Sequence, residues 1–169
     1  MADNPLCIRP LTEDDLEAVC SIEGLSFPTP WPVQSFISDL RRPALATYLV
    51  AEQDKKVIGY TGFWLIVDEA HITTLAVHPD YRRRHVAEHL LLQLIDAAQK
   101  RGAVWMTLEV RVSNDAAHSF YEKSGFQDIA MRKGYYSDNG EDAIVMWTGP
   151  IHEAVFKKGL ERLKAGFQK

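Results

Sequence analysis

The stretch from His85 to Lys100 constrains the fold of this chain more than any other segment. Its apolar residues recur at three- and four-residue intervals, which is the pattern of a helix with one buried face. Gly102 follows at the position where helices commonly end. β-prone segments run from 70 to 77 before this helix and from 103 to 112 after it. This strand, helix, strand order favours an α/β or α+β fold built on a central sheet. The apolar set is Val86, Leu90, Leu91, Leu94, Ile95 and Ala98.

The remaining segments predict further strands and helices around that centre. Helices are expected after Thr12, which fits an N-cap, and over 33–40 and 114–123. Residues 151–167 repeat apolar side chains at Val155, Leu160 and Leu163, which predicts an added helix at the C-terminal end. Further strands are expected at 6–9, 47–52, 57–67, 126–131 and 143–148.

Charge and composition limit the classes of function. The 169 residues carry a formal net charge of −4, which argues against a general affinity for nucleic acid. No apolar run approaches the roughly 20 residues needed to cross a bilayer. Residues 1–4 lack the basic and apolar regions of a signal peptide, so we expect a cytoplasmic protein without membrane partners. The two cysteines and six histidines show no metal-ligand spacing, and no metal is expected.

A basic turn joins the strand at 70–77 to the helix at 85–100. Arg82, Arg83 and Arg84 come just before the helix start, where unbonded N–H groups and a partial positive charge favour an anion. A diphosphate fits such a site, and the small Ala87 would let the backbone approach it. A solvated basic turn before a surface helix explains the same residues equally well.

The segment from Arg82 to Ala87 resembles the coenzyme A motif of the GNAT superfamily of N-acetyltransferases. In that motif, Arg or Gln is followed by x-x-G-x and then by Gly or Ala. The resemblance extends over about 8–147 and implies acetyl-coenzyme A as co-substrate. It also implies a GNAT domain over 1–150, with a central mixed, twisted sheet of about six to seven strands flanked by helices. The helical extension expected over 151–169 departs from the family, whose close relatives usually stop near the last strand. The strand before the motif would pair with the pantetheine arm as a pseudo-strand. The cofactor-binding residues are then Leu75, Ala76, Val77, Arg82, Arg83, Arg84, His85, Val86, Ala87, Glu88 and Asn114.

His85 departs from this motif, because it stands where the family has glycine. Glycine frees the backbone in such a turn and leaves room for a phosphate. The histidine ring could point outward without effect, contact a phosphate, or weaken cofactor binding. All three outcomes are compatible with the sequence.

Glu109 lies within an apolar strand segment, Leu108-Glu109-Val110. A carboxylate in such a place is costly to bury without a partner, and partial burial would raise its pKa toward that of a general base. The alternative is a solvent-facing position in an alternating strand.

Tyr121 lies in the segment Phe120-Tyr121-Glu122-Lys123-Ser124-Gly125-Phe126, where an aromatic side chain is usually part of a core. The segment is similar to a GNAT motif whose tyrosine protonates the departing coenzyme A thiolate. The resemblance therefore implies that Tyr121 is the general acid, with Glu109 as the general base.

Several segments resemble the ribosomal-protein-alanine N-acetyltransferases more narrowly: Glu109-Val110-Arg111, Ser113-Asn114, Gly134-Tyr135-Tyr136 and Gly140-Glu141-Asp142-Ala143. This resemblance implies that the acceptor is the N-terminal α-amine of a small-subunit ribosomal protein. Phe27, Trp31, Tyr135 and Tyr136 would flank it, although these aromatics could equally anchor their loops. Other amine acceptors, such as lysine or a polyamine, stay open, as does a non-catalytic coenzyme A sensor.

Overall fold

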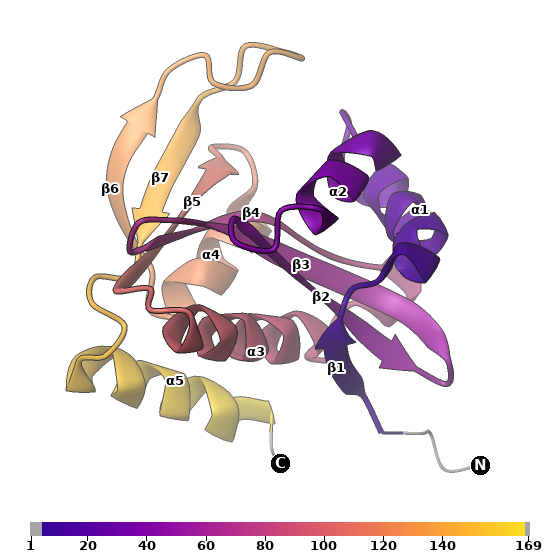
Figure 1. The fold of residues 1–169 in the computed structure, drawn as a ribbon. Coiled ribbons are helices and arrows are strands. Elements are labelled where there is room, and N and C mark those ends of the chain that lie inside the picture. The colour runs from indigo at the N-terminus through magenta and orange to yellow at the C-terminus, as the bar shows by residue number, and fades with distance from the viewer. Residues whose placement is uncertain (1–4, 168–169) are drawn as a thin grey trace.

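The computed structural model describes residues 5–167; residues 1–4, on which the expectation about a signal peptide depends, lie outside the described residues, as do 168–169. A seven-stranded sheet in the order β1-β2-β3-β4-β5-β7-β6 crosses the molecule, with helices on both faces (Figure 1). The prediction of a mixed sheet of six to seven strands flanked by helices is confirmed. The strands are β1 (Cys7–Pro10), β2 (Ala46–Gln53), β3 (Lys56–Ile66), β4 (Glu69–Val77), β5 (Trp105–Arg111), β6 (Gln127–Arg132) and β7 (Ala143–Trp147). The α-helices are α1 (Leu16–Ser26), α2 (Val33–Leu40), α3 (Val86–Lys100), α4 (Asp115–Lys123) and α5 (Ala154–Phe167), and short 3-10 turns span Glu13–Asp15 and Pro79–Tyr81.

Alternating side chains of the sheet build two hydrophobic cores. Tyr48 and Val50 of β2 pack with α1 and α2, whereas Leu49 and Ala51 belong to the core beneath α3. Successive strand residues point to opposite faces, so one strand serves both cores. Between residues 5 and 167, no helix is long and apolar enough to cross a bilayer.

Within residues 5–167, β4 and β5 are the only neighbouring strands that run parallel, and they separate from each other along their length. Their register runs from Glu69 opposite Trp105 to His71 opposite Thr107 and then stops, although β4 continues to Val77 and β5 to Arg111. All other neighbours in the sheet are antiparallel. The sheet therefore opens between these two strands, in its middle.

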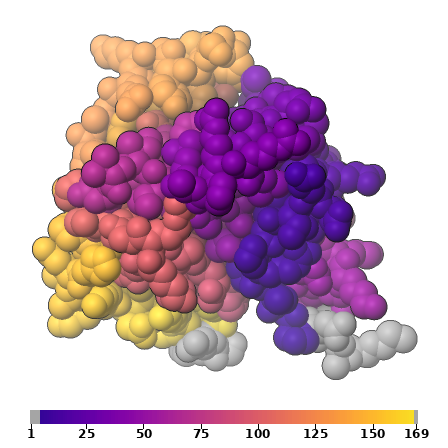
Figure 2. Space-filling view, viewed as in Figure 1, coloured from indigo at the N-terminus to yellow at the C-terminus, as the bar shows by residue number. Residues whose placement is uncertain are grey.

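The predicted C-terminal helix is present as α5 and lies beside α3 (Figures 1 and 2). Its buried side chains are Phe156 and Leu160, which join the core under α3. Val155, one of the apolar residues whose repeat predicted this helix, does not join that core, because its side chain is 82% exposed. Phe156 instead fits against Gly125, where a Cβ atom would lie 3.1 Å from its ring.

Candidate active site

A cavity of about 530 Å³ occupies the opening between β4 and β5. Leu75 borders it from β4 and Glu109 from β5, while α4 adds Tyr121 and its N-cap Asn114. The α1–α2 and β6–β7 connections, which lie next to each other at the top of the molecule in Figure 2, also border it. The structure thus brings together eight of the predicted site residues: Phe27, Trp31, Leu75, Glu109, Asn114, Tyr121, Tyr135 and Tyr136. Those that do not border it are Ala76, Val77, Arg82, Arg83, Arg84, His85, Val86, Ala87 and Glu88.

Glu109 points into this cavity with its side chain only 10% exposed. The Nε2–H of His71 donates to its Oε2 at 2.5 Å, and Arg132 lies 3.7 Å from its Oε1. Burial alone would raise the pKa of Glu109, but the hydrogen bond from His71 and the charges of His71 and Arg132 outweigh it and hold the pKa below its ordinary value. The prediction of a raised pKa is therefore wrong, because the partners of this carboxylate were not foreseen.

His71 is one residue of this site that sequence reasoning missed. It stands on β4 opposite Thr107, and Glu109 follows Thr107 by two positions on the same face of β5. The register alone thus places the imidazole beside the carboxylate. The sequence offered one signal, which is a histidine in an otherwise β-prone segment. It did not indicate the partner, because Glu109 is 38 positions away in the sequence.

Tyr121 is both a core aromatic and a cavity residue. It is 8% exposed and packs edge-on against Phe120 and Phe126, with ring centroids 5.1 and 5.3 Å away. Burial raises the pKa of its hydroxyl, with a smaller contribution from Tyr136. The phenol is therefore protonated at neutral pH, which is the form that a proton donor requires.

Asn114 caps α4, since its Oδ1 accepts from the N–H of Ala117 at 3.1 Å. The structure thereby gives it the capping role that the sequence allowed. Because it also borders the cavity, the cap does not remove it from reach of a ligand.

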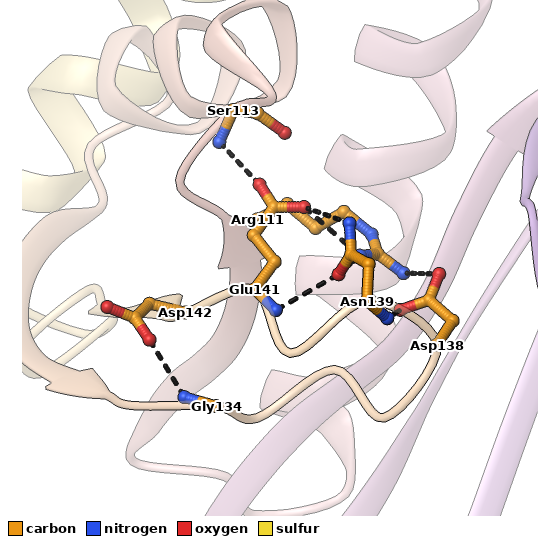
Figure 3. Close-up of polar contacts among 7 residues, drawn as sticks. All are labelled: Arg111, Ser113, Gly134, Asp138, Asn139, Glu141 and Asp142. Atoms are coloured by element: carbon orange, nitrogen blue, oxygen red, sulfur yellow. Dashed lines mark hydrogen bonds and ion pairs between the residues drawn. The ribbon is translucent and has the colours of Figure 1, made fainter.

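A polar network fixes the β6–β7 loop that carries Tyr135 and Tyr136 (Figure 3). Arg111 of β5 binds Asp138 at 2.8 Å and Glu141 at 3.1 Å, and its guanidinium lies 3.8 Å from the centroid of the Tyr136 ring. Hydrogen bonds from Ser113 lower the pKa of Glu141 to about 2, so this carboxylate is ionised at neutral pH. The two tyrosine rings meet edge-on at 5.1 Å and are held at the cavity wall.

The opposite wall comes from the loop between α1 and α2. The Trp31 ring packs against Phe36 and Trp64, with ring centroids 5.8 and 6.2 Å away, and the backbone N–H of Trp31 donates to Oε1 of Glu23 at 3.0 Å. Both Phe27 and Trp31 also pack on the core under α1 and α2, so they anchor the loop as well as border the cavity.

The basic turn leads from the end of β4 into α3. Nε of Arg82 donates to the carbonyl of Val77 at 3.0 Å, whereas Arg83 and Arg84 are exposed. Arg84 lies over the Tyr81 ring at 5.3 Å. The three arginines thus come directly before the first turn of α3, and none of them forms an ion pair within residues 5–167.

His85 adopts the left-handed conformation that glycine would favour, with φ of 59° and ψ of 18°. Its Nδ1 lies 3.1 Å from Oε1 of Glu88, and its ring stacks on Phe167 of α5 at 5.5 Å. The ring thus makes contacts within the protein while remaining 51% exposed.

The edge of β4 that faces the opening presents backbone N–H and C=O groups with which a ligand could pair. His78 N–H donates to Ile58 O at 2.8 Å, and alternation along the strand then turns the N–H and C=O of Leu75 and Val77 toward the β5 side. The Val77 carbonyl is taken by Arg82, and the Ala76 carbonyl faces Gly59 of β3. Leu75 is therefore the best placed of the three to pair with an extended ligand.

A strand pair that opens around a cavity, followed by a basic turn at the start of a helix, is the arrangement expected of an acyl-coenzyme A-dependent transferase. Comparison with known families agrees with this class: the acetyltransferase (GNAT) family matches residues 16–126. The chain belongs to this family and is an N-acetyltransferase.

Within the family, the chain resembles the ribosomal-protein-alanine N-acetyltransferases. The ribosomal protein bS18-alanine N-acetyltransferase of Escherichia coli (strain K12) is 38% identical over 141 residues, covering 82% of this chain and 94% of the relative. A Bacillus subtilis (strain 168) protein, provisionally named for the same activity, is 41% identical over 140 residues, 83% of this chain and 93% of its own. The crystal structure of the ribosomal-protein-S18-alanine N-acetyltransferase from Escherichia coli superposes with a TM-score of 0.79 at 36% identity, covering 89% of this chain and 96% of that one.

Proposed function

We propose that this enzyme transfers the acetyl group of acetyl-coenzyme A to the N-terminal α-amine of a protein, with an alanine N-terminus of a small-subunit ribosomal protein as the acceptor. One observation supports the proposal above all: Glu109 and Tyr121 border the same cavity, at the point where β4 and β5 separate. Relatives that cover most of this chain act on bS18. The reaction would take place in the cytoplasm.

Acetyl-coenzyme A would enter along the open edge of β4. The diphosphate fits the first turn of α3, where backbone N–H groups, the helix dipole and Arg82, Arg83 and Arg84 favour a dianion. The pantetheine arm would extend the sheet by pairing with Leu75, and the thioester would then lie between β4 and β5. Asn114 is near enough to the cavity to contact the arm.

Glu109 would remove the proton of the attacking amine. An N-terminal amine has a pKa of about 7.7–8.0, so a sizeable fraction is already neutral near pH 7 and a strong base is not needed. A carboxylate with a lowered pKa is therefore adequate, provided that it is held in place. His71 positions it through the hydrogen bond to Oε2.

Tyr121 would complete the transfer as the acid. The amine nitrogen attacks the thioester carbonyl, the C–S bond breaks, and the thiolate takes the phenolic proton. A thiol pKa of about 8.5 lies below the raised pKa of the tyrosine, so donation depends on contact at the moment of bond breaking. Solvent then returns a proton to the phenolate.

The test is acetyl transfer from labelled acetyl-coenzyme A to three acceptors. These are an Ala-starting hexapeptide, the same peptide with a blocked N-terminus and one free lysine, and spermidine. Transfer to the free Ala N-terminus alone supports the proposal. Transfer to lysine or to spermidine keeps the acetyltransferase but refutes the acceptor. Coenzyme A binding without turnover on any of the three identifies a sensor instead.

A further inference from the structure

Glu23 of α1 is a buried acid with one unused oxygen. Its Oε1 accepts a hydrogen bond from the backbone N–H of Trp31 at 3.0 Å, whereas Oε2 is buried and has no hydrogen-bond partner within residues 5–167. The residue is 3% exposed, and it borders the same cavity as Glu109.

The other buried acids of the described chain, Asp15 and Asp39, have no buried oxygen that lacks a hydrogen-bond partner. Asp39 accepts from the Tyr48 hydroxyl at 2.7 Å and from Nε1 of Trp64 at 2.8 Å. Asp15 binds the Arg9 guanidinium with both oxygens at 2.8 Å. Glu23 is thus exceptional, because a carboxylate oxygen without a donor is expensive to bury.

The position of Glu23 indicates what could supply the donor. Its neighbours on the cavity wall are Phe27, Thr29 and Trp31 of the α1–α2 loop, on the side assigned above to the acceptor. No cation of residues 5–167 forms an ion pair with it. Burial raises its pKa, and a positively charged or strongly polar N–H group would compensate for that burial.

We propose that Glu23 docks the acceptor, with Oε2 accepting an N–H from the amino-terminal end of the bound peptide. This inference rests on the proposed function. The N–H belongs either to the α-ammonium or to the amide of the second residue, which share the same donor chemistry. Because Oε2 is buried in this structure, docking requires the groups that cover it to move aside.

The Glu23→Gln variant tests the docking of the acceptor while keeping the support that Glu23 gives to the α1–α2 loop at Trp31. The amide oxygen of glutamine can still accept the Trp31 N–H, while its NH2 group replaces the accepting oxygen with a donor. We expect KM for an Ala-starting peptide to rise about tenfold or more. The value of kcat and the KM for acetyl-coenzyme A should stay within about twofold, and the melting temperature should not fall. Glu17→Gln, an exposed change on the same helix, is the matched control and should leave all four quantities unchanged.

A peptide methylated on the amide nitrogen of its second residue distinguishes the two donors. If Glu23→Gln no longer affects KM for the methylated peptide, the amide is the partner; if the effect persists, the ammonium is the partner. A wild-type KM in Glu23→Gln, with active wild-type enzyme, overturns the inference and leaves Glu23 as a loop anchor. If the wild-type enzyme acetylates no acceptor, the proposed function fails and the inference falls with it.

Discussion

Replacing His85 by glycine or by alanine measures the backbone strain stored at the start of α3. Both variants lose the contacts of the ring with Glu88 and Phe167. Only glycine relieves the positive φ of 59°. The left-handed conformation costs a residue with a Cβ atom about 1–2 kcal/mol, which glycine avoids. The greater freedom of glycine in the unfolded chain offsets this advantage by about 0.4–1 kcal/mol. The expected difference is thus about 1 kcal/mol in favour of His85→Gly.

Thermal unfolding of the two variants under the same conditions gives the comparison. For a protein of this size, about 1 kcal/mol corresponds to a melting temperature about 2–4 °C higher for His85→Gly than for His85→Ala. Urea titration supplies the free energies of unfolding directly. If His85→Ala is as stable as His85→Gly or more stable, the turn does not store the strain described here.

Three further perturbations follow from the site and the fold. Tyr121→Phe should lower kcat by about 100-fold or more while the Kd for coenzyme A changes little, and a kcat within threefold of the wild type would exclude it as the acid. Gly62→Ala should destabilise the protein by about 1–3 kcal/mol in urea titration, because the added Cβ atom would lie 2.3 Å from the ring of Tyr48; unchanged stability would refute that packing. The pKa of Glu141 is about 2 in the folded protein against an ordinary 4.5, so the bonds that join it to Arg111 and Ser113 are fully present above pH 4.5 and are lost as the pH falls toward 2. Carboxyl NMR titration should show this low midpoint for Glu141, and a midpoint near 4.5 would contradict the network.

The pattern of apolar residues predicted the helices and strands well, because the periodicity of each element can be read within a short segment. The helix at 33–40 matches α2 in full, and the helix expected over 85–100 is α3, which begins one residue later and ends at the same residue. The amphipathic pattern of 151–167 also predicted a helix, but not its buried face. Phe156 rather than Val155 is inside, because the contact that selects it is Gly125, which another part of the chain supplies.

Sequence reasoning indicated those residues of the candidate site that lie within short motifs. It did not indicate contacts between segments that are far apart in the sequence. The resemblance indicated Glu109 and Tyr121, and the structure puts both on one cavity. The direction of the Glu109 pKa could not be foreseen, since it depends on His71, which only the β4–β5 register brings near. The bare oxygen of Glu23 likewise becomes visible only when its surroundings are known.

The most direct test of this account is the rate of acetyl transfer to an Ala-starting hexapeptide by Glu109→Gln. The side chain keeps its size but can no longer take a proton, so kcat/KM should fall about 100-fold or more without loss of coenzyme A binding. Glu122→Gln, at an exposed position of α4, makes the same change of charge and should retain wild-type kcat/KM. A Glu109→Gln enzyme that keeps kcat/KM within about threefold of the wild type would contradict the assignment of Glu109 as the base.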